Sequence, residues 1–166
     1  GYQETLTDPS YHQQVVVMTA PHIGNTGMNI EDNESSKIWV AGFVVRNPSS
    51  ITSNWRSKSD LEEELIKQGV VGISGVDTRA ITRHLRDRGA MRVGIFSETD
   101  LTREEMVIEV RKQNPMTGAY LCGDVSTEVP YLVPAVGEKK FTVVALDLGI
   151  KVATPRNMAE RGIEVH

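Results

Sequence analysis

The sequence predicts an α/β protein in which a mixed α/β domain is followed by the beginning of an open parallel sheet. Short apolar runs alternate with helix-capping patterns along the 166 residues, as they do where helices cover sheets. The last part of the chain holds a strand, a helix and the start of another strand, which is the order of a β-α-β unit. The composition, with 39% hydrophobic and 24% charged residues, is that of an ordinary globular protein.

Two strands are predicted before the first helix signal. The valine-rich run Gln14–Thr19 indicates the first strand, and Ile38–Arg46 indicates the second, which should end at the turn residues Asn47-Pro48. The loop Pro21–Asn29 between them contains two glycines and two asparagines, which tolerate left-handed backbone conformations. Because no Lys-Ser/Thr pair or long helix follows at once, this loop is expected to be a turn rather than a phosphate-binding P-loop.

Two helices are predicted from capping boxes. Ser59 and Glu62 have the required spacing, so a helix should begin there and end near Gly69. Thr102 and Glu105 repeat the pattern and predict a helix that continues for about ten residues.

Asp77 is expected to cap another helix, which Gly89 ends. A short strand or extended passage at Val70–Val76 should precede this helix, and a strand at Val93–Phe96 should follow it. This helix is rich in cations: Arg79, Arg83, Arg86 and Arg88. They could form a surface for an anion or an acidic partner. The residues alone favour a solvated helix face, because cations near a helix C-terminus interact well with its dipole.

A new structural unit is predicted after the Pro- and Ser-containing connection of residues 126–140. It comprises a buried parallel strand at Phe141–Leu146, a helix at about Val152–Arg161 with Pro155 in its first turn, and a strand from Ile163. We therefore predict a domain boundary near residues 136–140. The chain begins without Met or a secretory leader and stops within the last predicted strand, so we expect a fragment of a longer protein.

Charge and cysteine content argue against several functions. With 18 basic and 22 acidic residues and a net charge of −4, the chain lacks the basic footprint of a nucleic-acid binder. Its apolar runs are too short to cross a bilayer. We thus expect neither nucleic acid nor membrane as a partner. Cys122 is the only cysteine, which excludes an internal disulfide and fits the reducing cytoplasm.

Cys122 and the histidines are the residues that first suggest catalysis or metal binding. A reactive cysteine needs a nearby base or cation, whereas the neighbouring Asp124 would disfavour the thiolate, so Cys122 is expected to be a small buried structural residue. The histidines are His12, His22, His84 and His166. Their spacing does not suit a metal, so no metal site is expected, and His84 should pack against the core. No complete catalytic constellation is present.

Four stretches, taken in order, resemble the small, glutamine-hydrolysing subunit of carbamoyl phosphate synthetase. They are Gly1–Tyr11, Pro21–Ser35, Gly75–Gly89 and Val144–Lys151. Their order and spacing over essentially the whole chain make the match specific. The resemblance implies that residues 1–136 are the N-terminal mixed α/β domain of this family, with its start truncated. Residues 137–166 would be a linker and the first β-α-β piece of an open-sheet glutamine amidotransferase domain.

The resemblance also implies the chemistry of the intact protein. In the family, a cysteine thiolate assisted by a histidine and a glutamate attacks the carboxamide of L-glutamine. The ammonia released passes to a large subunit, which uses bicarbonate, ATP and Mg to form carbamoyl phosphate for arginine and pyrimidine biosynthesis. All three triad positions would follow His166, so we expect no catalytic residue, no cofactor and no activity in this chain alone.

One functional residue can be carried over from the family. Ser10, in Asp8-Pro9-Ser10-Tyr11, matches the serine that reaches the substrate glutamine across the domain cleft, and a hydroxyl can both donate to and accept from an amino acid. The local alternative is that Ser10 only caps a turn after Pro9. Cys122 stands where relatives commonly carry a small residue and does not inherit the nucleophile role. Ala153 stands where many relatives have asparagine, a departure that suggests a subfamily.

Two other interpretations remain open. The chain could be a noncatalytic docking module for a large synthetase subunit, or part of an amidotransferase coupled to another synthase. The N-terminal motifs argue against the second. A downstream cysteine on a strand-to-helix turn, followed by a histidine and a glutamate, would support the enzyme, whereas a stop codon would support the docking module.

Overall fold

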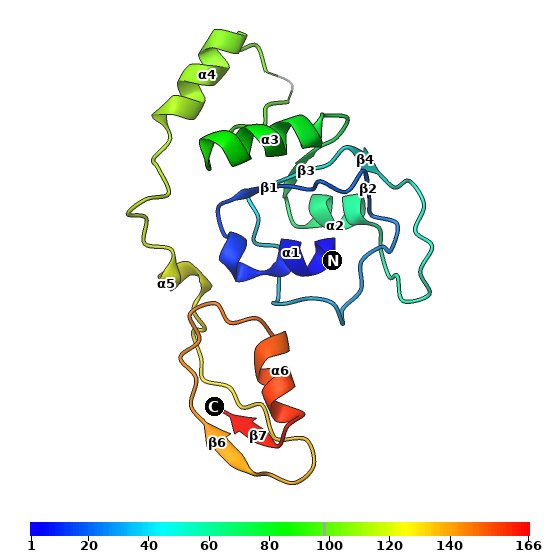
Figure 1. Cartoon of the computed structure of the whole chain (residues 1–166), viewed down its shortest axis with the longest axis vertical. Coiled ribbons are helices and arrows are strands. Elements are labelled where there is room, and N and C mark those ends of the chain that lie inside the picture. The colour runs from blue at the N-terminus through cyan, green and yellow to red at the C-terminus, as the bar shows by residue number, and fades with distance from the viewer. Residues whose placement is uncertain (98) are drawn as a thin grey trace.

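The computed structural model describes residues 1–97 and 99–166 and shows a mixed α/β chain with three small parallel sheets. The central sheet has the order β1-β3-β5, formed by Val15–Val17, Gly42–Val44 and Val71–Ile73. Val16 lies opposite Phe43, which in turn lies opposite Gly72. Figure 1 shows this sheet among α1, α2 and α3 in one part of the chain, and β6, α6 and β7 in a second, narrower part. The predicted α/β class is confirmed.

The core of the first part lies between the central sheet and two helices, α1 (Tyr2–Thr7) and α2 (Leu61–Lys67). Phe43 at the middle of the sheet and Leu6 of α1 are essentially inaccessible to solvent. The remaining members of this cluster are also buried: Tyr2, Ile23, Met28, Ile38, Val40, Val45, Leu61 and Leu65. The parallel sheet thus depends on side chains from α1 and α2, as parallel sheets generally depend on the helices that cover them.

The loop between the first two predicted strands is a turn, as expected. Gly24 and Gly27 have φ of 105° and 66°, values that glycine adopts without strain. The Gly27 N–H donates to the Gly24 carbonyl at 2.9 Å, which closes the turn. Asn47 and Pro48, predicted to break the second strand, instead form β4 (Asn47–Pro48), which pairs in parallel with β2 (His22–Ile23).

The cap of α2 lies one residue later than the sequence predicted. Asp60, not Ser59, is the N-cap, and its Oδ1 accepts the Glu63 N–H at 2.7 Å. Glu63, not Glu62, completes the box by accepting the Asp60 N–H at 3.4 Å. Ser59 uses its main chain elsewhere, because its carbonyl accepts the Met28 N–H at 2.9 Å.

Replacing Asp60 with alanine is expected to lower the free energy of unfolding by about 1 kcal/mol, because an N-cap acceptor is lost. Urea unfolding followed by far-ultraviolet circular dichroism measures this. Ser59→Ala is the control and should change the free energy of unfolding by less than about 0.5 kcal/mol. A larger loss for Ser59→Ala than for Asp60→Ala would show that Ser59 caps α2 after all.

Two further helices have the predicted caps. In α3 (Thr78–Arg88), Asp77 accepts the Ala80 N–H at 3.0 Å, and Gly89 follows the last turn with φ of 82°. In α4 (Arg103–Lys112), Thr102 and Glu105 form the capping box. Hydrogen bonds from the Thr102 N–H and, to a smaller extent, from the Thr102 hydroxyl lower the pKa of Glu105 below its usual value.

His84 on α3 is exposed, so the expectation that it packs against the core is wrong.

The strand predicted at Val93–Phe96 is absent, and residues 91–97 form neither helix nor strand. Apolar residues favour a strand only where a partner edge is available. Here Ile95 instead lies over the central sheet, since a Cβ added to Gly42 would come within 3.0 Å of its Cδ1. Arg92 donates to the carbonyls of Arg111 and Gln113 at 2.7 and 2.8 Å, which ties the segment to the end of α4.

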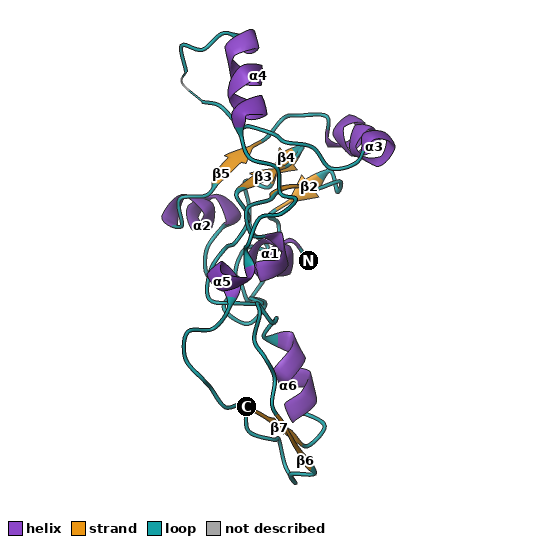
Figure 2. Ribbon diagram, turned by 90° about the vertical axis from the view of Figure 1, so that its left-hand side faces the viewer, coloured by secondary structure: helices purple, strands orange, loops and turns teal. Residues whose placement is uncertain are grey.

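The second part is the predicted β-α-β unit. Strands β6 (Phe141–Val143) and β7 (Ile163–Val165) are parallel, α6 (Ala153–Ala159) connects them, and Pro155 lies in its first turn. Figure 2 shows α6 beside this two-stranded sheet. The prediction that residues 141–146 are buried is wrong, because Phe141, Val144 and Leu146 are 66%, 79% and 86% exposed. Among the described residues, α6 is the only helix between the two strands.

The predicted boundary near residue 136 lies in an extended connection. Val133 forms an antiparallel bridge with Val165, and the Val136 N–H donates to the Ala159 carbonyl at 2.9 Å. The connection therefore contacts β7 and α6 of the β-α-β unit before β6 begins. In residues 1–97 and 99–166, no helix has both the length and the apolar character needed to span a bilayer.

Candidate functional site

The Ser10 loop, defined here as residues 8–12, directly follows α1. Its backbone is fixed by Asp8, whose Oδ1 accepts the Ser10 N–H at 2.9 Å and caps the single turn η1 (Pro9–Tyr11). Pro9 supplies the restricted φ suited to the first position of that turn. Ser10 itself is exposed, and its hydroxyl has no hydrogen-bond partner within the described residues. Asp8 rather than the Ser10 side chain caps the turn, which leaves the hydroxyl available for a ligand.

A hollow of about 150 Å³ opens beside Ser10. Three segments meet around it: the Ser10 loop, α5 (Cys122–Val125) and the turn at residues 147–150. Its walls are formed by Pro9, Ser10, His12, Gln14, Leu121, Cys122, Val125, Leu148 and Gly149. The volume is below the ~300 Å³ at which small-molecule pockets usually begin. The hollow can therefore hold one end of a small ligand.

Gly149 allows the two parts of the chain to meet at this hollow. Its φ of 94° favours glycine. A Cβ at this position would come within 3.2 Å of the Pro9 Cβ and 2.9 Å of a Val125 methyl group. Asp147 shapes the turn, because its Oδ1 accepts the N–H groups of Gly149 and Ile150, both at 2.9 Å.

Tyr131 adds a further bond to this turn. Its hydroxyl donates to Asp147 Oδ2 at 2.9 Å. Burial raises the pKa of Tyr131, and the hydrogen bond to Asp147 raises it further. The neutral phenol is therefore the form that links the connection before β6 to the turn after it.

Cys122 is exposed and lines the hollow with Ser10, so the expectation that it is buried is wrong. A nucleophile needs a base within hydrogen-bond reach. His12, the histidine among the residues that line this hollow, instead has its Nε2 atom 3.1 Å from Asp124 Oδ2 and meets Trp39 edge-on, with ring centroids 5.1 Å apart. Within the described residues, no hydrogen bond joins His12 to Ser10 or Cys122.

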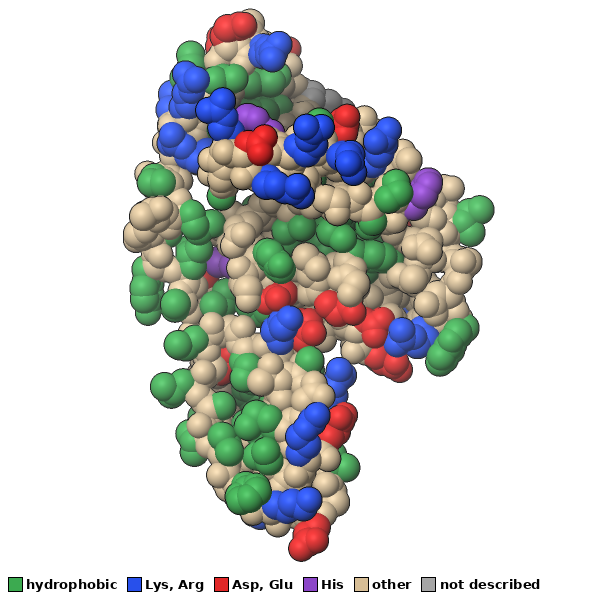
Figure 3. Space-filling view, in the orientation of Figure 1, with side chains coloured by type: hydrophobic (Ala, Val, Ile, Leu, Met, Phe, Trp, Pro, Cys, Tyr) green, Lys and Arg blue, Asp and Glu red, His purple; other side chains and the backbone are tan. Residues whose placement is uncertain are grey.

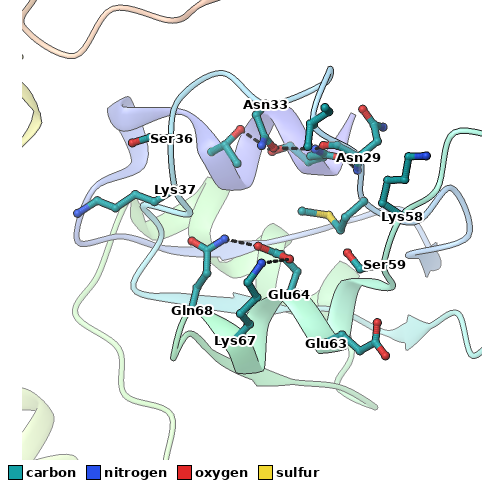
Figure 4. A pocket seen from close by; sticks show the side chains of 14 residues that line it. Asn29, Asn33, Ser36, Lys37, Lys58, Ser59, Glu63, Glu64, Lys67 and Gln68 are labelled. Carbon is teal, nitrogen blue, oxygen red and sulfur yellow. Dashed lines mark hydrogen bonds and ion pairs between the residues drawn. The ribbon is translucent and has the colours of Figure 1, made fainter.

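A larger hollow, of about 480 Å³, lies between α1, α2 and the loop at residues 28–37 (Figure 4). Its wall contains the buried Gln3, whose Oε1 accepts the Asn29 N–H at 3.0 Å and whose Nε2 donates to Asn33 Oδ1 at 2.6 Å. Glu64 and Lys67 form an ion pair across 3.7 Å. Several polar groups of this wall are thus paired with one another, whereas the side chains of Ser36 and Lys58, which also line the hollow, have no hydrogen-bond or ion-pair partner within the described residues.

Positive charge gathers on α3 (Figure 3). Four arginines of this helix are exposed, and within the described part of the chain none of them forms an ion pair: Arg79, Arg83, Arg86 and Arg88. In the same residues, no three His, Cys, Asp or Glu side chains lie close enough together to hold a metal ion. The cationic helix is suited to an acidic partner surface.

The fold and the site together define a class of protein: a mixed α/β domain whose exposed serine loop faces the turn of a following β-α-β unit. Comparison with known proteins specifies the family. Residues 1–95 match the family model described as "Carbamoyl-phosphate synthase small chain, CPSase domain". The chain therefore belongs to the carbamoyl phosphate synthase small-chain family, as the resemblance predicted.

Individual relatives match along the whole chain. The carbamoyl phosphate synthase small chain of Streptomyces coelicolor is 68% identical over 167 residues, which cover 100% of this chain and 44% of the relative. That of Mycobacterium tuberculosis is 58% identical over 172 residues, covering 100% of this chain and 46% of the relative. That of Corynebacterium efficiens is 58% identical and covers 98% and 42%, respectively. The chain thus spans less than half the length of the curated relatives it matches.

The sequence predicts Ser10 as a site residue, but it does not reveal the residues that hold the Ser10 loop against the second part of the chain. Asp8 lies 3.4 Å from the Lys151 ammonium, and Glu34 accepts hydrogen bonds from the first residues of α6. The Asp-Pro-Ser-Tyr and Glu-Ser motifs marked both carboxylates as part of matching stretches. Only the three-dimensional structure shows that they reach the β-α-β unit.

Proposed function

We propose that this chain is part of the small subunit of a glutamine-dependent carbamoyl phosphate synthase. The whole protein would hydrolyse L-glutamine and deliver ammonia to a large subunit. The large subunit would use ATP, Mg and bicarbonate to make carbamoyl phosphate for arginine and pyrimidine biosynthesis in the cytoplasm. The observation that carries this proposal is the 68% identity to a carbamoyl phosphate synthase small chain along the entire chain.

Ser10 would bind the amino-acid end of glutamine. Its exposed hydroxyl has no partner among the described residues and borders a hollow large enough for only part of a ligand. A hydroxyl can donate to the carboxylate or accept from the ammonium of an amino acid. The rest of the substrate would lie against residues of the complete protein that follow this chain.

The bond-breaking step would belong to those following residues. A cysteine thiolate would attack the carboxamide carbon of glutamine, and the histidine of the complete protein would donate a proton to the departing nitrogen as the C–N bond breaks, so that ammonia leaves and a thioester remains. Water would then hydrolyse the thioester to glutamate and regenerate the thiol. Residues of this chain would contribute by holding the substrate in position for the attack.

The large subunit would dock on the cationic surface of α3, and acidic groups of the large subunit would contact the arginines of this helix. This agrees with the exposed arginines of that helix, which have no carboxylate partner within the described residues. The absence of a nucleophile–base pair in the same residues favours a second candidate function for the chain in isolation, that of a noncatalytic docking module.

The 166-residue chain alone is expected to release no ammonia from glutamine above the buffer rate, because within residues 1–97 and 99–166 no candidate base forms a hydrogen bond with the Cys122 thiol. A coupled glutamate dehydrogenase assay measures ammonia, with the full-length protein as the positive control. Turnover by the 166-residue chain that disappears in Cys122→Ser would contradict this prediction. Failure of the full-length protein to support glutamine-dependent carbamoyl phosphate formation with its large subunit would overturn the proposed function.

A further inference from the structure

Glu34 connects the two parts of the chain at the beginning of α6. The Val152 N–H donates to the Glu34 carbonyl at 2.9 Å, and the Ala153 N–H donates to Glu34 Oε2 at 3.2 Å. The second bond joins residues 119 positions apart in the sequence. A main-chain and a side-chain acceptor of one residue therefore bind successive N–H groups at the start of the helix, where such groups lack partners within the helix.

Glu34 is itself fixed to the end of α1. The Glu34 N–H donates to Thr7 Oγ1 at 2.8 Å, and the Ser35 hydroxyl donates to the Thr7 carbonyl at 2.6 Å. Thr7 is 2% exposed, and its hydroxyl donates to the Gln3 carbonyl at 2.9 Å. These bonds attach Glu34 to the residue that immediately precedes the Ser10 loop.

A second contact reaches α6 from the Ser10 loop itself. Lys151, which precedes the helix, has its ammonium 3.4 Å from Asp8 Oδ2. The other carboxylate oxygen of Asp8 accepts the Ser10 N–H. Asp8 is buried, whereas the Lys151 side chain is 45% exposed, so the ion pair is only partly shielded from water. The start of α6 is thus held at two points. Glu34, which is bonded to Thr7, holds its first N–H groups, and Asp8, which also accepts the Ser10 N–H, holds Lys151.

We infer that Glu34 is a positioning residue for the site at Ser10. By fixing the start of α6 to the end of α1, it keeps the turn at residues 147–150 against the Ser10 loop and so preserves the hollow between them. Glu34 does not line that hollow, and its effect on a ligand would pass through Ser10. The inference rests on the proposed function, because it assigns a consequence for glutamine binding.

Glu34→Ala, Glu34→Gln and Glu62→Ala in the full-length protein with its large subunit test this inference. L-Glutamine is the substrate in the assay, and its KM and kcat are measured for each variant. Hydrogen exchange of the peptide spanning residues 148–158 is followed by mass spectrometry. Glu34→Gln retains a side-chain carbonyl acceptor for the Ala153 N–H, whereas Glu62→Ala removes an exposed glutamate of α2.

Glu34→Ala is expected to speed exchange in the 148–158 peptide and to raise KM about two- to tenfold with little change in kcat, as the loss of one hydrogen bond would. Glu34→Gln should restore most of both properties, and Glu62→Ala should alter neither. If Glu34 acts through Ser10, adding Glu34→Ala to Ser10→Ala should raise KM by less than it does in the wild-type background.

The outcomes separate the inference from the proposed function. Unchanged exchange in Glu34→Ala, or faster exchange with unchanged KM, would overturn the positioning role while leaving a Ser10 effect on KM intact. Equal effects of Glu34→Ala with and without Ser10 would also overturn it, because Glu34 would then act independently. If Ser10→Ala itself leaves KM unchanged, the glutamine site proposed at Ser10 fails, whatever the exchange data show for the contact between Glu34 and α6.

Discussion

Replacing Phe43 with alanine is expected to lower the free energy of unfolding by about 3–5 kcal/mol, which is the usual cost of removing a buried phenyl ring. Phe43 is 1% exposed and lies on the middle strand of the central sheet, where it meets side chains of α1 and α2. The loss combines transfer of the ring out of the apolar core with the cavity that remains, because the strands on either side prevent collapse.

Urea unfolding monitored by circular dichroism measures this loss. Phe141→Ala provides a matched control, since the same side chain is 66% exposed on β6. It should cost less than about 1 kcal/mol, because little apolar surface is returned to water. Phe43→Leu should fall between the two. Equal losses at Phe43 and Phe141 would contradict the placement of the core between the central sheet, α1 and α2.

Local features of the fold could be predicted because their causes are local. Asp77 and Thr102 cap helices with their own side chains, and Pro155 fits only the first turn of a helix. Ser59 and Asp60 show the limit of this reasoning. Both residue types cap helices well, and each is followed by a glutamate three residues later. Asp60 becomes the N-cap because the Ser59 main chain is held by a tertiary hydrogen bond.

Features that depend on distant partners could not be predicted. The apolar segment 93–96 has a strand composition, yet it lies over the central sheet instead of pairing with it. The environment of Cys122 depends on where α5 meets the Ser10 loop. The bond between Glu34 and Ala153 joins residues 119 positions apart, and no periodicity along the chain indicates such a contact. The prediction of Ser10 as a ligand-binding residue rests only on the resemblance of its motif to that of a family.

Replacing Ser10 with alanine in the full-length protein is expected to raise the glutamine KM about tenfold and to change kcat much less. Loss of one hydrogen bond of about 1–1.5 kcal/mol to the bound amino acid corresponds to roughly this factor. The effect should appear mainly in KM, because the hydroxyl would bind substrate and transition state alike. Glutaminase kinetics over a range of glutamine concentrations separate the two constants.

The Ser10 variant should fold normally, which makes the kinetic result interpretable. Ser10 is exposed, and its loop is capped by Asp8 through the Ser10 main-chain N–H, which alanine retains. Ser10→Thr keeps a hydroxyl and should recover part of the lost affinity, while Ser50→Ala removes an exposed serine elsewhere and should have no effect. An unchanged KM in Ser10→Ala would remove this residue from the glutamine site, and the free hydroxyl beside the hollow would then have no role in binding substrate.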